Sequence, residues 1–342
     1  MAELTEAAET TSPPRSPERF TMGWRVVAAK EFSDHLLSIR FTILIVIVGL
    51  AAVAAVYTAA GGIREAAEQI GSADDIPGLF LKLFTVTPEG SRLPAFFAGI
   101  ALLAPLFGIA FGFDAVNGER AQGTLPRLLS QPIYRDDVIN GKFVAGLSVI
   151  GLTISTLTMV VAGIGLLRIG VVPTFSDIAR LLIWLLVTIV YVGFWLALAT
   201  LFSVLLRRAS TSALAAFATW VVASLFALLL VGIVADIVSP VSQEGNAEEV
   251  IENARTQRNL SRVFPQALYQ EATVALLEPE QRTFDILGLL VLQSPGSGAI
   301  PGPLSLEQSV LVVWPQVTGL IALTVLCFAA AYVSFMRQEV RA

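Results

Sequence analysis

The residues whose types and spacing could do chemistry concentrate in one stretch, residues 118–142, which reads GERAQGTLPRLLSQPIYRDDVINGK. It lies between two long apolar runs and mixes Glu, Arg and Asp with glycine and proline, which is unusual for a connector that only reverses the chain. A phosphate-binding loop would need the pattern GxxxxGK followed by Ser or Thr. Gly141 and Lys142 form the one Gly-Lys pair, but Phe143 follows them, so this stretch does not hold nucleotide phosphates.

Other common catalytic patterns are also absent from the sequence. No HExxH or GxSxG motif occurs, His35 is the only histidine, and Cys327 is the only cysteine. A multi-histidine metal site and an intrachain disulfide are thereby excluded, and we expect no catalytic residue, metal or cofactor in this chain. We expect His35 on a solvated surface and Cys327 to pack as a small apolar side chain. An intramembrane enzyme without a known motif stays open.

Composition identifies the elements that must position the charged stretch. The chain has 342 residues, of which 55% are hydrophobic and 14% are charged, whereas soluble domains carry about 25% charged residues. A helix needs about 20 apolar residues to cross a bilayer. The sequence contains six such runs without the period-two alternation of a barrel, at residues 41–60, 94–113, 143–167, 181–206, 213–235 and 310–336. We therefore predict an all-α polytopic membrane protein.

The six runs contain no Asp, Glu, Lys, Arg or His. Charges inside spans usually mark the ion pathways of secondary carriers, so a proton- or sodium-driven carrier is disfavoured. Thr153, Ser155, Thr156 and Thr158 form the one polar cluster, and we expect them to make hydrogen bonds between helices. Pro105 predicts a packing kink in the second run.

The N-terminal part divides in two. Residues 1–21 are rich in Pro, Ser, Thr and Glu, which predicts a disordered tail. Residues 22–40 place apolar side chains, including Trp24 and Phe32, at helical spacing, with Glu31 and other charges on the opposite face. This pattern predicts an amphipathic helix lying in the membrane interface, although a plain extension of the first span is the alternative.

Lys and Arg concentrate before the first run and between even and odd runs, which places both termini in the cytoplasm of a multi-pass plasma-membrane protein. The acidic residues gather on the other side, and no basic footprint for nucleic acid is present.

The two longer outer segments are residues 61–93 and 237–309. In the first, LFLKLF predicts an interfacial patch; in the second, a polar start is followed by one helical face, formed by Leu260, Val263, Phe264, Ala267, Leu268, Val274 and Leu277.

The charged stretch closely resembles the signature of the ABC-2-type permease family, the membrane subunits of ATP-driven exporters. The match consists of Glu119, Gly123, Thr124, Leu125, Leu128, Leu129, Ser130, Pro132, Arg135, Gly141 and Lys142. The outer segment also resembles the nitrous-oxide-reductase maturation permease subgroup through Phe264, Pro265, Leu268 and Tyr269, with Phe where that subgroup usually has Ser.

This resemblance implies that residues 41–342 form a six-span permease domain and that residues 114–142 are a coupling loop that docks on a separate cytoplasmic ATPase, which would carry ATP and Mg²⁺. The docking residues it implies are Glu119, Gly123, Thr124, Leu125, Leu128, Leu129 and Arg135. The alternative is that Glu119 and Arg135 only pair within the loop and that Gly123 only turns the chain. It also implies pairing with a second permease copy, as a homodimer or a heterodimer, in contact with membrane lipids.

Two alternatives to an exporter subunit stay open. The ATPase could drive work on an extracytoplasmic protein through the outer segment at residues 237–309 without transport. The chain could also be an ATP-independent carrier, which the charge-free spans disfavour. The transported substrate does not follow from the sequence.

Overall fold

The computed structural model describes residues 23–70, 78–87, 94–123, 134–170, 172–242, 247–279 and 304–338; for residues 65–70 it describes the backbone alone. Within these ranges every regular element is a helix, and six helical segments are long and apolar enough to cross a membrane. They are Ile39–Arg64, Phe96–Ala121, Arg135–Ile169, Phe175–Leu205, Ala209–Val238 and Leu306–Arg337. The prediction of six spans in an all-α membrane protein is confirmed, whereas the tail at residues 1–21 lies outside the described residues.

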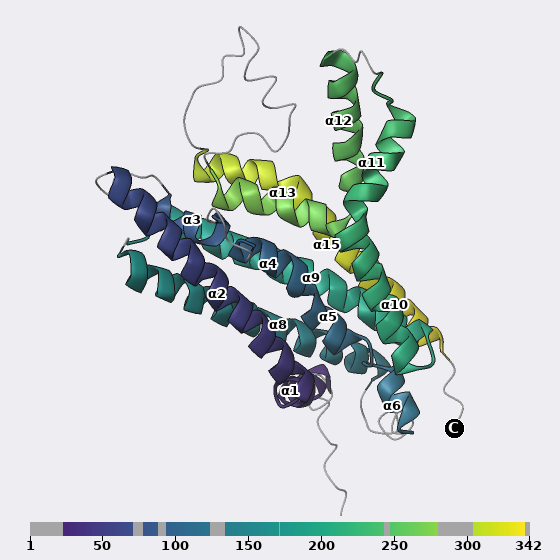
Figure 1. Ribbon diagram of the computed structural model, residues 1–342. Coiled ribbons are helices and arrows are strands. Elements are labelled where there is room, and N and C mark those ends of the chain that lie inside the picture. The colour runs from purple at the N-terminus through teal and green to yellow at the C-terminus, as the bar shows by residue number, and fades with distance from the viewer. Residues whose placement is uncertain are drawn as a thin grey trace, which may run out of the picture.

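The long helices run along one another around α9 (Phe175–Leu205) (Figure 1). This helix packs against α5 (Pro105–Gly112), α8 (Arg135–Ile169), α10 (Ala209–Val221), α13 (Pro265–Leu277) and α15 (Leu306–Arg337). Its Trp184, Tyr191 and Trp195 are fully buried and fill the centre of the core. By contrast, α2 (Ile39–Ile70), α10 and α15 expose many large apolar side chains, as helices facing lipid do.

Two glycines bring α5 against α9. A Cβ on Gly108 would lie 2.7 Å from the carbonyl oxygen of Val192, and one on Gly112 would lie 2.8 Å from that of Leu196. Their GxxxG spacing is the pattern that lets membrane helices approach closely. The second span is thereby fixed to the central helix.

Two of the described spans, the second and the fifth, contain an irregularity that the third does not. The second is divided at Ala104 into α4 (Phe96–Leu103) and α5, because Pro105 cannot donate a backbone hydrogen bond. The fifth contains a π-helix, η3 (Val222–Phe226), between α10 and α11 (Ala227–Val238). The third is regular, and its Thr153 and Thr156 donate to the carbonyl oxygens of Val149 and Leu152 on their own helix, so the expected interhelical bonds from these two residues are wrong.

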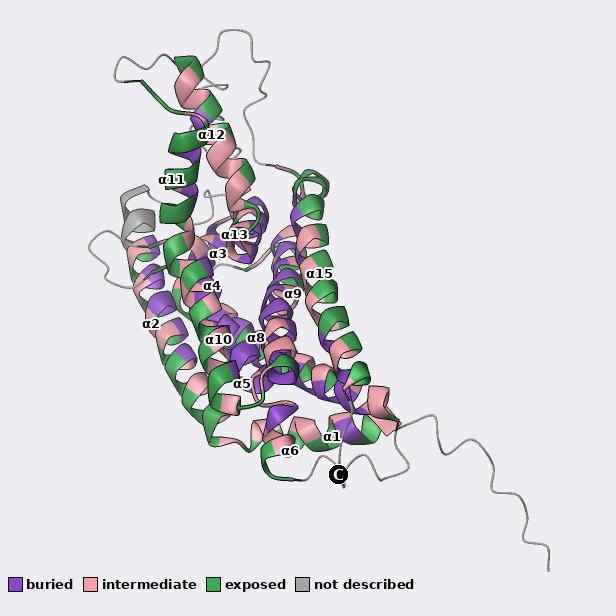
Figure 2. Cartoon of the chain, turned by 90° about the vertical axis from the view of Figure 1, so that its right-hand side faces the viewer, coloured by how far each residue is buried: buried purple, intermediate pink, exposed green. Residues whose placement is uncertain are grey.

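At one end of the bundle, which we call the elbow end, α1 (Gly23–Leu36) runs across the ends of the spans (Figure 2). It is a separate helix, because the chain turns at Leu37 and Ser38 before α2 begins. The Ser38 side chain accepts a hydrogen bond from the Phe41 amide at 3.2 Å and donates to the His35 carbonyl at 2.7 Å. Residues 22–40 are therefore not a plain extension of the first span. α6 (Asn117–Ala121) lies at the same end.

At the opposite end, which we call the arm end, α3 (Leu79–Thr85) and α13 are buried in the core. The LFLKLF sequence of α3 was expected as an interfacial patch; this is wrong, because Phe80, Leu81 and Phe84 are buried. Between the described residues 247 and 279, the second outer segment forms two helices, α12 (Ala247–Ser261) and α13, where one helical face was expected. Val263 falls in the break between them and is 70% exposed. α11 and α12 project together as an arm (Figure 1).

Candidate functional site

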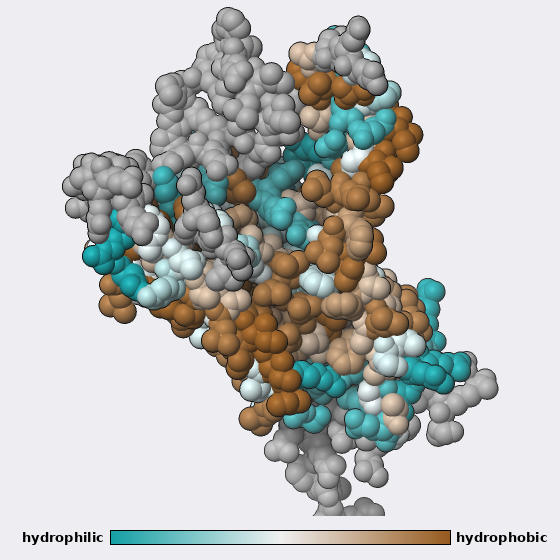
Figure 3. Space-filling model, viewed as in Figure 1, coloured by the Kyte–Doolittle hydropathy of each residue, from teal (hydrophilic) through white to brown (hydrophobic). Residues whose placement is uncertain are grey.

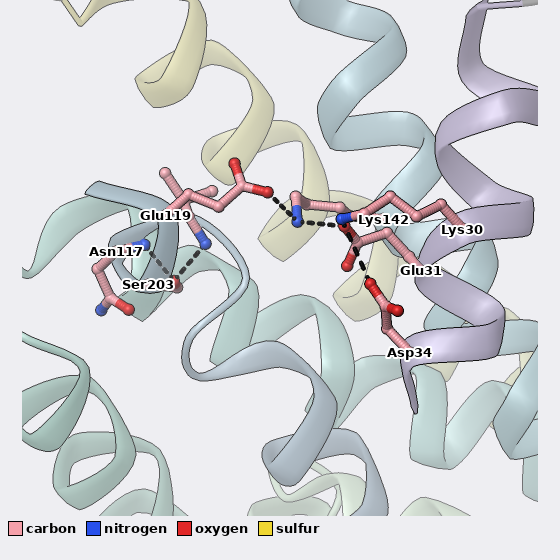
Figure 4. A network of polar contacts seen from close by, with 8 residues as sticks. Lys30, Glu31, Asp34, Asn117, Glu119, Lys142 and Ser203 are labelled. Carbon is pink, nitrogen blue, oxygen red and sulfur yellow. Dashed lines mark hydrogen bonds and ion pairs between the residues drawn. The ribbon is translucent and has the colours of Figure 1, made fainter. Parts of the chain in front are cut away.

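Lys142 is the centre of a charged network at the elbow end (Figure 4). Its ammonium lies 2.9 Å from Glu31 Oε1 on α1 and 2.8 Å from Glu119 Oε1 on α6. The Lys142 side chain is 7% exposed, so this cation is stable there because two carboxylates surround it. One side chain of α8 thereby connects α6, the last helix of the second span, to α1, the helix that precedes the first span.

The network continues along α1. Lys30 contacts Glu31 at 3.4 Å and Asp34 at 3.3 Å. Burial works to raise the pKa of Glu31, but the adjacent Lys142 and Lys30 outweigh it and leave that pKa below its usual value. Glu31 is therefore ionised at neutral pH and holds α1 against α8. The sequence pattern had placed it on the polar face of α1, away from the bundle, and the structure corrects this.

Ser203, near the end of α9, fixes the start of α6. Its hydroxyl oxygen accepts hydrogen bonds from the backbone amides of Val116 at 2.9 Å and Asn117 at 3.2 Å. These amides begin a helix and have no partner within it. The α6 turn that carries Glu119 is thus attached to the central helix of the bundle.

Gln338, directly after α15, joins three segments at the elbow end. Its side-chain oxygen accepts a hydrogen bond from Arg120, its backbone carbonyl accepts one from Arg135 Nη1 at 3.0 Å, and its side-chain nitrogen donates to the Val204 carbonyl at 2.8 Å. Arg120 and Arg135, which lie on the two described sides of loop 114–142, are therefore both bonded to Gln338. A displacement of this loop would act on α9 and α15 as well as on α1 and α8.

Gly141 lets α1 lie directly on α8. A Cβ at this position would come within 2.8 Å of the Trp24 carbonyl oxygen and 2.8 Å of Val27 Cβ. Gly123 has a different role, since its φ is +67° and nothing lies within 4 Å of its Cβ position. It supplies a left-handed turn at the point where loop 114–142 leaves α6.

His35 faces the bundle. Its ring centroid lies 4.7 Å from that of Phe111, and burial lowers its pKa below the usual value. The expectation of a solvated surface position is wrong, because the α1 face that carries His35 is packed on α5. Trp24 is half-buried, and Phe32 packs against the main core.

The residues predicted to dock an ATPase fall into two sets. Glu119, Gly123 and Arg135 are described, and Glu119 and Arg135 point to Lys142 and Gln338 of this chain. Thr124, Leu125, Leu128 and Leu129 lie outside the described residues. In the described part of the chain no group of three potential metal-ligating side chains is present.

The sequence reasoning missed Glu31, Ser203 and Gln338, and it gave Lys142 no role beyond its place in the matched pattern. Of these four residues, only Lys142 could have been recognised from the sequence. It is a charged residue directly before an apolar run, and a buried charge must be paired.

The arm end has a second polar centre at Arg180 on α9, which is 3% exposed. Its guanidinium donates to the carbonyl oxygen of Leu276 at 3.2 Å, to that of Leu304 at 2.6 Å and to the Ser309 hydroxyl at 2.8 Å. These bonds join α9 to the end of α13 and the start of α15. Arg180 thereby fixes the outer segment to the bundle.

Aromatic contacts extend this attachment. Tyr269 of α13 stacks on Tyr191 of α9 with ring centroids 4.4 Å apart, and the Trp184 indole donates to the Thr273 hydroxyl at 3.1 Å. In the Phe264, Pro265, Leu268 and Tyr269 pattern, the last three residues are buried. The pattern therefore describes packing of α13 into the bundle.

Comparison with protein families gives a match to the model of the ABC-2 family transporter protein over residues 25–340. The match includes α1, the six spans and the arm. It is to the broad family and does not single out the nitrous-oxide-reductase maturation subgroup. No curated protein matches the chain.

Proposed function

The chain belongs to the ABC-2 transporter family, and on that premise we propose that it is the membrane permease subunit of an ATP-driven exporter. In this proposal loop 114–142 faces the cytoplasm and docks on a separate ATPase that carries ATP and Mg²⁺. We also propose that both termini are cytoplasmic, which is supported by the contacts of α1 and Gln338, the first and last described segments, with the two sides of that loop. A second permease copy completes the transport pathway.

One observation carries the coupling proposal: both described ends of loop 114–142 are attached to elements of the bundle. Glu119 is paired with Lys142, which also holds Glu31 on α1. Arg135 is bonded to Gln338 after α15. A force applied by an ATPase to the loop would therefore reach the interfacial helix and the spans through charge-assisted contacts.

In the mechanism we propose, closure of the ATPase pair moves the loops and tilts the spans so that access changes from one side of the membrane to the other. The GxxxG contact between α5 and α9 would make these helices move as one unit. At the arm end, Arg180 would keep α13 fixed to α9 and α15 during this motion.

Copurification with an ATPase assay tests the proposal. We expect a protein with a phosphate-binding loop to accompany the chain from its native membrane in detergent, and hydrolysis of ATP by the complex. Leu125→Asp should uncouple hydrolysis from transport without loss of membrane insertion, because a charge replaces an apolar contact. Leu167→Asp, the same change at an 89% exposed position near the arm end, is the matched control. Normal coupling in Leu125→Asp would refute the docking assignment.

The projecting arm of α11 and α12 favours a second candidate function, in which the ATPase drives work on an extracytoplasmic protein. ATP hydrolysis would then be stimulated by a protein bound to the arm and not by a small transported molecule. Removal of residues 241–250 would abolish that stimulation, whereas a permease would keep stimulation by its cargo.

A further inference from the structure

A cavity of about 530 Å³ lies where the arm meets the bundle. Its walls come from η3 and α11 on one side and from α12 and α13 on the others. Cavities of about 300 to 1,000 Å³ suit small-molecule ligands. In Figure 3 hydrophilic residues, in teal, gather on α12 and α13 beside the brown surface of α11. The site thus combines a polar wall with an apolar one.

The polar wall contains hydrogen-bonding groups that the protein leaves unused. Ser224 and Gln266 both line the cavity, and Ser224 Oγ and Gln266 Oε1 are buried atoms without a hydrogen-bond partner in the described part of the chain. Buried polar atoms are almost always hydrogen-bonded, so rotation of these two side chains toward the cavity would let a bound molecule that donates hydrogen bonds complete both groups. Three further polar residues line the same cavity: Gln257, Ser261 and Gln270.

Ser224 is positioned by an irregular helix. It lies in the π-helix η3, whose five residues interrupt the regular hydrogen bonding of the fifth span. π-helical turns occur frequently at functional sites. The irregularity is found where the span borders the cavity, and two of its residues, Ala223 and Ser224, line it.

The lining is balanced in charge. It includes one cation, Arg258, and one anion, Glu271. Glu271 is already engaged, because Arg262 contacts its carboxylate at 3.1 Å and the Gln316 amide donates to it at 2.9 Å. Arg258 also interacts with another group of the chain. A head group with a net charge would therefore be desolvated without a compensating partner, whereas a neutral or zwitterionic one would not.

The apolar wall opens toward the surface that faces lipid. Leu228 and Val231 line the cavity from α11, and Leu228 is 83% exposed. Further along α11, Ile237 and Val238 are also exposed. An alkyl chain could lie along this helix while a polar group occupies the cavity.

We propose that this cavity binds the polar head of an amphipathic molecule of zero net charge, with its alkyl chain along α11. The proposal names the substrate class of the permease and in that respect rests on the proposed function. Occupancy of the site itself needs no ATPase, so binding is measured on the full chain alone in lipid nanodiscs. Loss of ATPase copurification would sink the proposed function without affecting this test.

Photolabelling with four dodecyl amphiphiles, each with a diazirine on the chain carbon next to the head group, tests the proposal. The heads are maltoside, phosphocholine, trimethylammonium and sulfate. We expect the maltoside or the phosphocholine probe, or both, to label the cavity walls, residues 223–231 and 254–274, about tenfold more than either charged probe. Equal labelling by all four, or labelling spread evenly over the lipid-facing helices, would overturn the proposal.

A double variant identifies the head-group contacts. Ser224→Ala with Gln266→Leu should lower labelling by the preferred probe about tenfold, since two hydrogen bonds are lost. Ser148→Ala with Gln122→Leu makes the same changes at exposed positions away from the cavity and should leave labelling unchanged. Unchanged labelling in the first variant would overturn the assignment of the polar wall. The four-probe series on the unaltered chain decides the question if that variant does not fold.

Discussion

Lys142 at the elbow end and Arg180 at the arm end are both buried cations, but their partners differ. Lys142 lies between two carboxylates from two other helices, whereas Arg180 donates to two backbone carbonyls and a hydroxyl. An ammonium acts as a point charge and stays paired when its partners shift, while a planar guanidinium requires acceptors in fixed directions. The comparison suggests that the elbow end transmits movement and the arm end resists it.

Removal of the Lys142 cation should have the largest effect. Lys142→Met removes the cation that Glu31 and Glu119 share in a half-buried site, and we expect a loss of ~3–5 kcal/mol in stability, measured by thermal unfolding in detergent. The triple variant with Glu31→Gln and Glu119→Gln should recover most of this loss because the two carboxylates that Lys142 neutralises are then uncharged. A melting temperature of Lys142→Met equal to that of the unaltered chain would contradict the network.

Removal of the Arg180 cation should cost less, because its partners are uncharged. Arg180→Met leaves the carbonyls of Leu276 and Leu304 without their donor, which should destabilise the chain by ~1–3 kcal/mol in the same assay. Arg180→Lys should recover only part of this loss, because one ammonium cannot reach three acceptors in the same directions. If Arg180→Lys were as stable as the unaltered chain, the proposed difference between the cation sites at the elbow end and the arm end would be contradicted.

Substitutions at two glycines of the elbow end distinguish the effect of a steric clash from the effect of backbone strain. Gly141→Ala should cost ~1–3 kcal/mol and speed hydrogen exchange in α1, because the added methyl meets the Trp24 carbonyl. Gly123→Ala has open space and only a strained φ, so we expect about 1 kcal/mol and no change in α1 exchange. Equal exchange of α1 in both variants would show that Gly141 does not seat this helix.

Acid should release α1 in two steps. The lowered pKa of His35 means that the unfolded chain takes up a proton first, so stability falls as the pH drops below 6.5. Groups acting on His35 include Glu31, Asp34, Asp114 and Lys142. The lowered pKa of Glu31 gives a contribution that is complete above 4.5 and is lost as the pH falls below it.

Hydrogen exchange of α1 across this pH range measures both steps. His35→Asn should remove the upper step and keep the lower one, and Glu31→Gln should do the reverse. An upper step that persists in His35→Asn would assign it to another group.

Much of the fold was predictable because span length and apolar composition are local properties. The six predicted runs each lie within or overlap one observed span, and the separate helix at residues 23–36 follows from its periodicity. Burial of α3 was not predictable, since LFLKLF is equally apolar at an interface and in a core. Contact of α3 with α2, α4, α8, α9 and α13 decides between these environments.

The site was predictable in part. Turn formation at Gly123 follows from glycine itself, and its positive φ agrees. The partner of Lys142 on α1 is 111 residues away in the chain, and one sequence contains no signal for such a pair. The same limit applies to Gln338, whose bonds to Arg120 and Arg135 exist only once the C-terminal segment returns to the elbow end.

The central claim is that loop 114–142 contacts an ATPase, and site-directed crosslinking in native membranes tests it most directly. With Cys327→Ala as background, Leu125→Cys would carry a photoactivatable crosslinker, and the captured protein would be identified by mass spectrometry. The account predicts a protein with a GxxxxGK phosphate-binding loop, captured at position 125 and not from a cysteine at Leu167. Capture of no such protein at position 125, in membranes where the chain is fully active, would contradict it.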